Sequence, residues 1–283
     1  MAKVPCDAFL LLESLTLHNL INLERICIDR LKVDSFNELK TIKVESCDEI
    51  FAIGGEADVV TEEIFAQISC LSLGNLPQLT SFCREVKRHS MSSNTKDSQD
   101  QSTTAITCSY EVNLEDKLDT STGLFNDKVR LPKLEALELH EINVEKIWRS
   151  QVPAKFPRFQ SLTRLVVSNC HKLKYLFSAS MIRSVEQLQH LDICLCKGLL
   201  GIISEDTAIQ VTPCFVFPRV STLRLIDLPK LRFFYPGMHT SEWPTLKSLE
   251  ATGCDNLKIF GSEFEENQLH IPAQQPLFLF EKV

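Results

Sequence analysis

No stretch of this 283-residue chain approaches the ~20 consecutive apolar residues that a membrane-spanning helix requires. The first residues also lack the basic start and apolar centre of a secretory signal peptide. No Asn-x-Ser/Thr acceptor for glycosylation occurs, and the 11 cysteines are an odd number. These absences favour a reducing compartment, so we expect a cytoplasmic, intracellular protein without a membrane span.

Signatures of bound nucleotides, metals and nucleic acids are lacking as well. The sequence has no Gly-x-x-x-x-Gly-Lys-Ser/Thr loop to cradle phosphates, and its only glycine pair, Gly54-Gly55, is not followed by Lys-Ser. No Cys-x-x-Cys pair is present and the histidines are scattered. The net charge of −7, without a basic stripe, makes nucleic acid a poor partner. We therefore expect no cofactor, no metal and no nucleic acid.

What the sequence does contain is one apolar spacing that recurs through most of its length. The first copy consists of Leu12, Leu15, Leu17, Leu20, Leu23 and Ile26. Six more copies keep this register and begin at Leu39, Ile68, Leu162, Leu188, Val220 and Leu246. An eighth begins at Leu134 and reaches its last apolar residue, Ile147, one residue early. Starts of adjacent uninterrupted copies lie 26 to 32 residues apart, a period typical of leucine-rich repeats.

The spacing dictates a stacked architecture. Within each copy the apolar–x–apolar pair, such as Leu223 and Leu225, sends both side chains to one face of a short strand. One coil cannot cover its own apolar side, but stacked coils cover each other. The pattern therefore predicts an α/β-type solenoid, a leucine-rich-repeat horseshoe. We expect one short parallel strand per repeat on the concave side and mostly irregular or short helical segments on the convex side.

The fourth apolar column alternates between cysteine and Leu or Ile. Cysteine occupies it at Cys47, Cys170, Cys196 and Cys254. Because cysteine is small, buries readily and donates only weak hydrogen bonds, we interpret these four as core residues rather than ligands.

The pattern divides the chain into four segments. Residues 1–83 hold repeats 1 to 3, and residues 124–260 hold repeats 4 to 8. Residues 84–123 include an almost purely polar run, 90–104, which predicts a disordered insertion because it buries too little apolar surface to offset ordering. The tail, 261–283, ends in Leu-Phe-Leu-Phe-Glu-Lys-Val and repeats the Leu-Phe-Asn-Asp-Lys-Val lead-in of repeat 4. We expect this tail to lead into a further repeat of a longer array.

Two short sequence motifs recur in the repeats and point to a particular protein family. One motif ends in cysteine, as in Asn169-Cys170 and Gly253-Cys254, and the other is Asp227-Leu228-Pro229. Copies also open with dipeptides such as Phe217-Pro218 or Trp243-Pro244. In these features the chain, over roughly residues 8–283, resembles the C-terminal leucine-rich repeats of plant disease-resistance proteins. Those proteins are intracellular receptors with coiled-coil, nucleotide-binding and repeat regions.

The resemblance implies a recognition and autoregulatory module of an immune receptor. In that family the repeats sense a pathogen effector, or a guarded host protein altered by one, and hold the nucleotide-binding domain inactive. The implied partners are thus the nucleotide-binding and coiled-coil domains of the same receptor and an effector or host protein. This chain shows no phosphate loop and no coiled-coil heptads, so nucleotide binding is not carried over. An alternative is a stand-alone adaptor, for example the substrate-recognition part of a ubiquitin ligase.

Strand geometry predicts which side chains line the concave, protein-binding face. The residues between the paired apolars are Thr16, Lys43, Ser72, Glu138, Val166, Asp192, Arg224 and Glu250. The next outward positions are His18, Glu45, Gly74, His140, Ser168, Cys194, Ile226 and Thr252. This mixture of charged and apolar groups suits protein recognition, in which a few anchors dominate affinity. Simple solvation of each strand is the competing interpretation for any single residue.

No catalytic arrangement emerges from the sequence. Cys196 belongs to the buried column whereas Cys194 points to the groove, so the two diverge. His18, His140 and His190 have no Ser or Cys nucleophile at a fixed spacing. The adjacent pairs Glu62-Glu63 and Glu265-Glu266 lie in polar turns, where carboxylates are usually solvated. We therefore expect a binding protein and not an enzyme.

Overall fold

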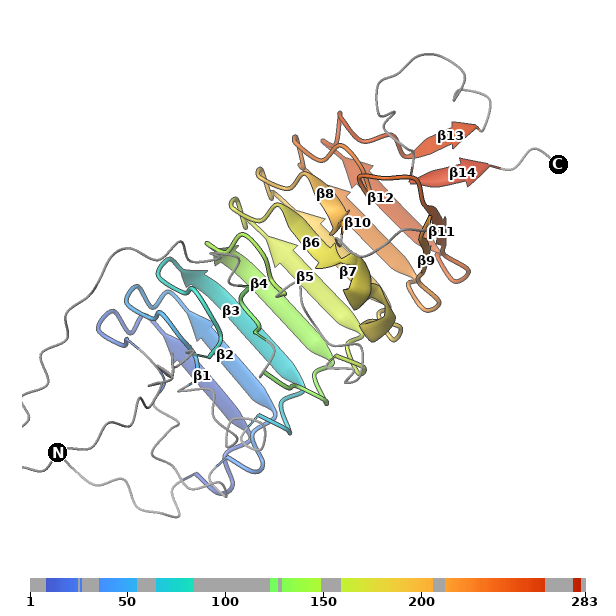
Figure 1. Cartoon of the computed structure of the whole chain (residues 1–283). Helices are drawn as coiled ribbons and strands as arrows, with labels where there is room; N and C mark the ends of the chain where they lie inside the picture. The colour runs from blue at the N-terminus through green and yellow to red at the C-terminus, as the bar shows by residue number, and fades with distance from the viewer. Residues whose placement is uncertain are drawn as a thin grey trace, which may run out of the picture.

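A computed structural model describes residues 9–24, 26, 36–54, 65–83, 123–126, 129–148, 159–205, 212–262 and 277–280. Its main element is one eight-stranded sheet in which every neighbouring pair is parallel and strand order follows the sequence. The strands, in order across the sheet (Figure 1), are β1 (Ser14–His18), β2 (Thr41–Glu45), β3 (Cys70–Leu76), β4 (Ala136–Ile142), β5 (Arg164–Ser168), β7 (His190–Cys194), β10 (Thr222–Ile226) and β12 (Ser248–Thr252). Each apolar copy contributes one strand, which confirms the solenoid.

The register of the sheet follows the apolar columns. Leu191 pairs with Leu165 on one side and Leu223 on the other, and the column of Leu225 is continuous in the same way. From β2 to β10 both columns are at most 2% exposed. In β1 and β12 the same positions are half-buried, because each of these strands pairs on one side only within the described chain. The core thus consists of side chains shared between consecutive coils.

Opposite the main sheet, the coils carry shorter elements (Figure 1). Three parallel pairs form there: β6 (Tyr175–Ser178) with β8 (Gly201–Ser204), β9 (Cys214–Val216) with β11 (Thr240–Glu242), and β13 (Phe260–Ser262) with β14 (Phe278–Phe280). The single 3₁₀ helix of the described residues, η1 (Ala179–Ser184), follows β6. The expected short helical segment is therefore present, and the three strand pairs add regular structure that the apolar spacing did not indicate.

The interruption between repeats 3 and 4 does not divide the sheet. β3 pairs directly with β4 from Cys70↔Ala136 to Leu76↔Ile142. On the opposite side, the Phe82 N–H donates to the Leu124 carbonyl at 2.7 Å, and the Phe125 N–H donates to Ile147 at 2.8 Å. Nearly all of the predicted disordered insertion, residues 84–123, lies outside the described residues, as does most of the predicted tail. The four segment boundaries remain predictions.

One turn geometry recurs at the C-terminal end of every strand of the main sheet, at the second-to-last residue of β3 and β4 and directly after the last residue of the others. The residue at the turn has a positive φ of 47° to 64° in each coil: Asn19, Ser46, Asn75, Glu141, Asn169, Leu195, Asp227 and Gly253. Gly, Asn and Asp adopt the left-handed region most readily, which explains why the two recurring sequence motifs have such residues at this turn. The next residue then enters the Cys or Leu column. Cys47, Cys170 and Cys196 are 0–1% exposed, and each thiol donates to the carbonyl two residues earlier at 3.3–3.4 Å.

Aromatic side chains pack behind the sheet, where the coils turn. Trp148 contacts Phe159 with ring centroids 4.5 Å apart, and Trp243 stacks on Phe217 at 4.1 Å. These contacts join adjacent coils and explain why the dipeptides at the start of the repeats contain an aromatic residue.

Candidate protein-binding face

The candidate site is the face of the main sheet that points away from the core. The eight residues predicted between the paired apolars lie in register, one per strand, and are called here the middle row: Thr16, Lys43, Ser72, Glu138, Val166, Asp192, Arg224 and Glu250. The next predicted positions form a second continuous line, the exit row: His18, Glu45, Gly74, His140, Ser168, Cys194, Ile226 and Thr252. Pairing between strands therefore joins residues that are 26 or more positions apart into two rows.

A third line of residues, the entry row, also lies on this face and was missed from the sequence. It consists of Ser14, Thr41, Cys70, Ala136, Arg164, His190, Thr222 and Ser248. The signal was available, because period-two alternation places the residue before the first strand apolar on the same face as the middle row. Arg164 is the member that matters most, since it pairs with a predicted site residue.

Not every predicted residue is accessible to a partner. Ser72, Val166 and Ser168 are only 6–8% exposed although they lie on the outer face. Gly74 shows how this arises: a Cβ atom there would lie 3.3 Å from Glu45 Cγ and 3.7 Å from His140 Cβ. Longer neighbours lean over the small residue here, and buried positions of this kind offer little surface to a partner.

At the C-terminal end of the face, one arginine is held between two carboxylates. Arg224 Nη1 donates to Asp192 Oδ2 at 2.6 Å, and Arg224 Nε donates to Glu250 Oε2 at 2.8 Å. The hydrogen bond to Glu250 and the charge of Asp192 raise the pKa of Arg224. The other oxygen of Asp192, Oδ1, is buried and has no hydrogen-bond partner among the described residues. The guanidinium is therefore fixed in place and still 41% exposed.

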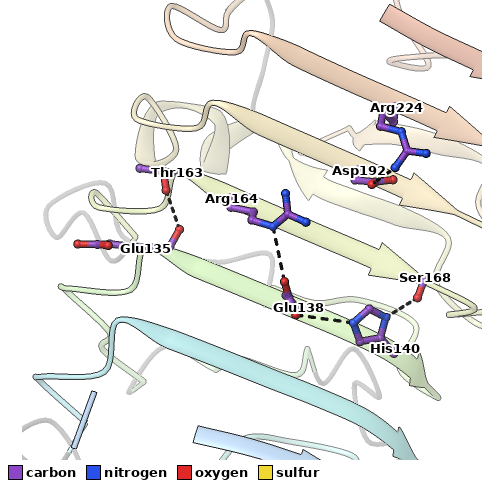
Figure 2. Close-up of polar contacts among 8 residues, drawn as sticks. All are labelled: Glu135, Glu138, His140, Thr163, Arg164, Ser168, Asp192 and Arg224. Carbon is purple, nitrogen blue, oxygen red and sulfur yellow. Dashed lines mark hydrogen bonds and ion pairs between the residues drawn. The ribbon is translucent and has the colours of Figure 1, made fainter. Parts of the chain in front are cut away.

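In the middle of the face, Glu138 links two neighbouring strands (Figure 2). Its Oε1 lies 3.5 Å from Arg164 Nε on β5, and its Oε2 lies 4.0 Å from His140 Nε2 on the same strand. His140 Nδ1 shares a hydrogen bond with the hydroxyl of Ser168.

The sequence showed no Ser or Cys nucleophile at a fixed spacing from His140, yet strand pairing places Ser168 beside it. The Ser168 hydroxyl is buried and Glu138 is shared with Arg164, so this network fixes side-chain positions on the face rather than presenting a reactive group.

At the N-terminal end, charges pair in exposed positions. Lys43 Nζ lies 3.2 Å from Glu45 Oε1, and Lys40 Nζ donates to Glu13 Oε1 at 3.0 Å. The hydrogen bond to Glu13 raises the pKa of Lys40. Exposed pairs of this kind contribute little to stability, because solvent and salt screen them. Their main effect on this face is to balance its charge.

Two cysteines face outward, unlike those of the buried column. Burial and the charge of Glu138 raise the pKa of Cys70, and burial together with Asp192 raises the pKa of Cys194. Cys196, two residues later, is buried in the column, and a hydrogen bond with Cys170 raises its pKa. Within the described ranges, no group of three or more His, Cys, Asp or Glu side chains is arranged to hold a metal ion.

Parallel strands stacked one per repeat, with an exposed polar face and a shared apolar core, define a leucine-rich-repeat protein, a scaffold for recognising other proteins. In the part of the chain that the structure describes, no helix has the length and apolarity to cross a membrane.

The sequence places the chain in a particular family of such proteins. The family model of plant disease resistance protein RPS2-like leucine-rich repeats matches residues 105–197 and 133–267, and the chain belongs to this family. It is 28% identical over 144 residues to the probable disease resistance protein At4g27220 of Arabidopsis thaliana, covering 50% of this chain and 15% of that protein. It is 29% identical over 125 residues to the disease resistance protein RPS5 of the same plant, covering 42% of this chain and 13% of that protein. No solved structure matches the chain significantly.

Proposed function

We propose that the chain is the recognition and autoregulatory leucine-rich-repeat module of a plant intracellular immune receptor, and that it binds proteins through the outer face of the main sheet. The two Arabidopsis relatives are disease resistance proteins, and the chain spans only 15% and 13% of their lengths. A repeat region that matches only this small share of a receptor's length acts as one module of that receptor. We further propose a cytoplasmic location and a non-catalytic role.

The observation that carries the proposal is the Asp192–Arg224–Glu250 cluster. Its arginine is held by two carboxylates from neighbouring strands and remains exposed. A side chain fixed in this way loses little rotamer entropy when a partner binds, and arginine is enriched among residues that dominate interface affinity. Such an anchor can prefer one form of the receptor over another, with a usual coupling of about 1–3 kcal/mol.

The partners that we propose are the coiled-coil and nucleotide-binding domains of the same receptor and, in competition with them, a pathogen effector or a guarded host protein. The test is the affinity of this chain for the purified coiled-coil and nucleotide-binding segment, measured by biolayer interferometry for Arg224→Ala and Asp192→Asn. Arg232→Ala is the matched control, because Arg232 is an exposed arginine of the same coil outside the three rows.

We expect both face variants to weaken binding by about 10–100-fold, which corresponds to the usual contribution of an interface anchor. The control variant should bind like the unchanged chain. Unchanged affinity for substitutions along the whole middle row would overturn the proposal for this face.

A further inference from the structure

The turns that follow the strands of the main sheet stack along one lateral edge of the solenoid. In each coil the edge comprises six residues, beginning with the residue at positive φ. Backbone hydrogen bonds hold these segments in register. The Leu200 N–H donates to the Lys174 carbonyl at 2.9 Å, the Arg232 N–H to Leu200 at 3.0 Å, and the Leu228 N–H to Gly253 at 3.0 Å. We define the basic edge as the segments after β5, β7, β10 and β12: 169–174, 195–200, 227–232 and 253–258.

Exposed cations gather on the basic edge although no basic run marks it in the sequence. The four segments contain six cations: Lys172, Lys174, Lys197, Lys230, Arg232 and Lys258. They contain two carboxylates, Asp227 and Asp255, and all eight of these side chains are exposed. With His171 counted as neutral, four positive charges are in excess on an edge of a chain whose net charge is −7.

Neighbouring positions do not cancel this excess. The exit-row residue before each segment and the residue directly after it are uncharged in all four coils. Further back on the strands, Asp192, Arg224 and Glu250 bind one another and together carry one net negative charge. Even with that cluster included, positive charge remains in excess.

Most of the edge cations have no carboxylate partner. Lys174 Nζ lies 3.9 Å from Glu145 Oε2 of the preceding coil, and both side chains are more than half exposed. Over the described ranges of the chain, Lys172, Lys197, Lys230 and Arg232 form no ion pair. Because like charges on neighbouring coils repel one another, a partner that brings carboxylates relieves this repulsion as it binds.

The opposite lateral edge, where the strands of the same four coils begin, lacks such an excess. It comprises four segments: 159–163, 185–189, 217–221 and 243–247. Arg219 and Lys247 stand there against Glu186, which leaves one positive charge.

The turns of the first four coils have the opposite sign. Their segments are 19–24, 46–51, 75–80 and 141–146, and they carry five carboxylates against one cation, Lys146. Within the described stack, excess positive charge is therefore a property of one edge of the C-terminal half.

From this arrangement we infer that the basic edge is a docking site for an acidic protein segment, an extended stretch with several aspartate or glutamate side chains. Neighbouring strands lie ~4.8 Å apart, so the four coils distribute their cations over about 14 Å. An extended chain covers that length with about four to five residues, so carboxylates two or three residues apart reach successive coils. The inference concerns a surface beside the outer face and does not rest on the proposed function.

The extent of the edge favours a short protein segment over a nucleic acid or a membrane. A DNA duplex carries one negative charge per ~1.7 Å and continues in both directions past an edge of this length. The remainder of the chain is strongly negative and repels such an extended polyanion. An acidic protein segment confines its charge to the length of the edge, and complementary charge speeds its encounter with the chain.

Fluorescence polarisation with the full chain tests the inference. The probe is a fluorescein-labelled peptide with glutamate at every third position among glycine and serine, and a second probe has glutamine in place of glutamate. Lys197→Gln combined with Lys230→Gln removes two cations from adjacent coils of the basic edge. The matched control, Arg219→Gln combined with Lys247→Gln, removes two exposed cations from adjacent coils of the opposite edge.

We expect the glutamate peptide to bind and the glutamine peptide not to bind. The Lys197→Gln, Lys230→Gln variant should weaken binding by about 3- to 30-fold, the loss expected for two exposed charge pairs, and the control should bind like the unchanged chain. Added salt should weaken binding because it screens exposed charges. Both double variants should keep the unfolding midpoint of the unchanged chain, since the replaced side chains are exposed. A loss of binding is then not a loss of structure.

Several results would overturn the inference: no binding of the glutamate peptide, equal weakening by the control variant, or tighter binding of single-stranded DNA or of vesicles containing an anionic lipid. Self-association of the chain that the Lys197→Gln, Lys230→Gln variant abolishes would also overturn it, because the occupant would be the acidic turns of a second copy.

Failure of the peptide to bind would leave the proposed function intact, because that function concerns the outer face. Conversely, edge-dependent peptide binding alongside unchanged affinity of the receptor segment for every middle-row variant would remove the proposed function and leave the docking site. Arg232→Ala removes only one of the six edge cations and remains the control for the outer face.

Discussion

At the scale of single residues, the environment gives the same amino acid different roles. Cys47, Cys170 and Cys196 fill the core column and donate to backbone carbonyls. Cys70 and Cys194 lie on the outer face, half-buried beside carboxylates. Leucines divide similarly, since Leu225 is 1% exposed while Leu11 is 86% exposed. Position within the coil therefore decides what each residue contributes.

Leu225→Ala should reduce the free energy of unfolding by about 2–5 kcal/mol, because it removes a fully buried side chain and leaves a cavity between coils. Urea denaturation followed by circular dichroism measures the change. Leu11→Ala, in an exposed position, serves as the control and should change stability by less than about 0.5 kcal/mol. A loss below about 1 kcal/mol for Leu225→Ala would contradict the stacked core.

Cys194 should react with iodoacetamide more slowly than a free small thiol, and its reaction should need a higher pH. Burial and Asp192 raise its pKa, so a smaller fraction is thiolate, the reactive form, at any given pH. Mass spectrometry of the Cys194 peptide after alkylation across the alkaline range measures this. Asp192→Asn should shift the profile toward lower pH; a shift in the opposite direction would contradict the assigned cause.

At the scale of elements, each strand depends on the turn that ends it. Asn169 adopts a φ of 55°, and its N–H donates to the Cys194 carbonyl at 3.1 Å. The turn directs Cys170 into the core, so the conformation of one residue connects the outer face to the buried column. Asn, Asp and Gly fill five of the eight positions because they adopt the left-handed region at low energy.

Asn169→Val should destabilise the chain by about 1–2 kcal/mol, because a β-branched residue is strained at positive φ. Asn169→Gly keeps the conformation accessible and should stay within about 0.5 kcal/mol of the unchanged chain. Thermal unfolding of the two variants measures the difference. Equal midpoints would show that the turn does not need its left-handed residue.

How much of the site could be predicted depended on the range of the interactions. Period-two alternation and the repeat register were enough to place the middle and exit rows, since both follow from local strand geometry. The register also sets His140 and Ser168 next to each other in the exit row. Their hydrogen bond was not predicted, because the spacing does not specify side-chain conformations. Arg164 was missed for a simpler reason: its position before the first strand apolar was not included on the face.

The strand pairs behind the sheet were also beyond the pattern. β6 and β8 form in the part of each copy where two or more residues separate consecutive apolar positions. No apolar–x–apolar alternation therefore indicates a strand there. They form because consecutive coils bring their backbones side by side, as with the Ile203 N–H and the Phe234 carbonyl at 2.8 Å. Backbone pairing of this kind is decided by stacking rather than by local sequence.

At the scale of the whole molecule, the outer face changes character along the stack. Balanced exposed ion pairs at the N-terminal end give way to the Glu138–Arg164–His140–Ser168 network and then to the Asp192–Arg224–Glu250 cluster. Because every coil contributes one residue to each row, single substitutions can change this surface without altering the core. The scaffold and the outer face can therefore vary independently of each other.

Under the proposed function, partners bind the outer face of the main sheet. Its most direct test is site-specific photo-cross-linking of the coiled-coil and nucleotide-binding segment. A benzophenone side chain is introduced singly at Lys43 and Glu250 on the face, or at Thr80 and Arg183, which lie outside the three rows. We expect cross-links from the face positions, strongest at Glu250, and none from the other two. Cross-links confined to Thr80 or Arg183 would contradict it.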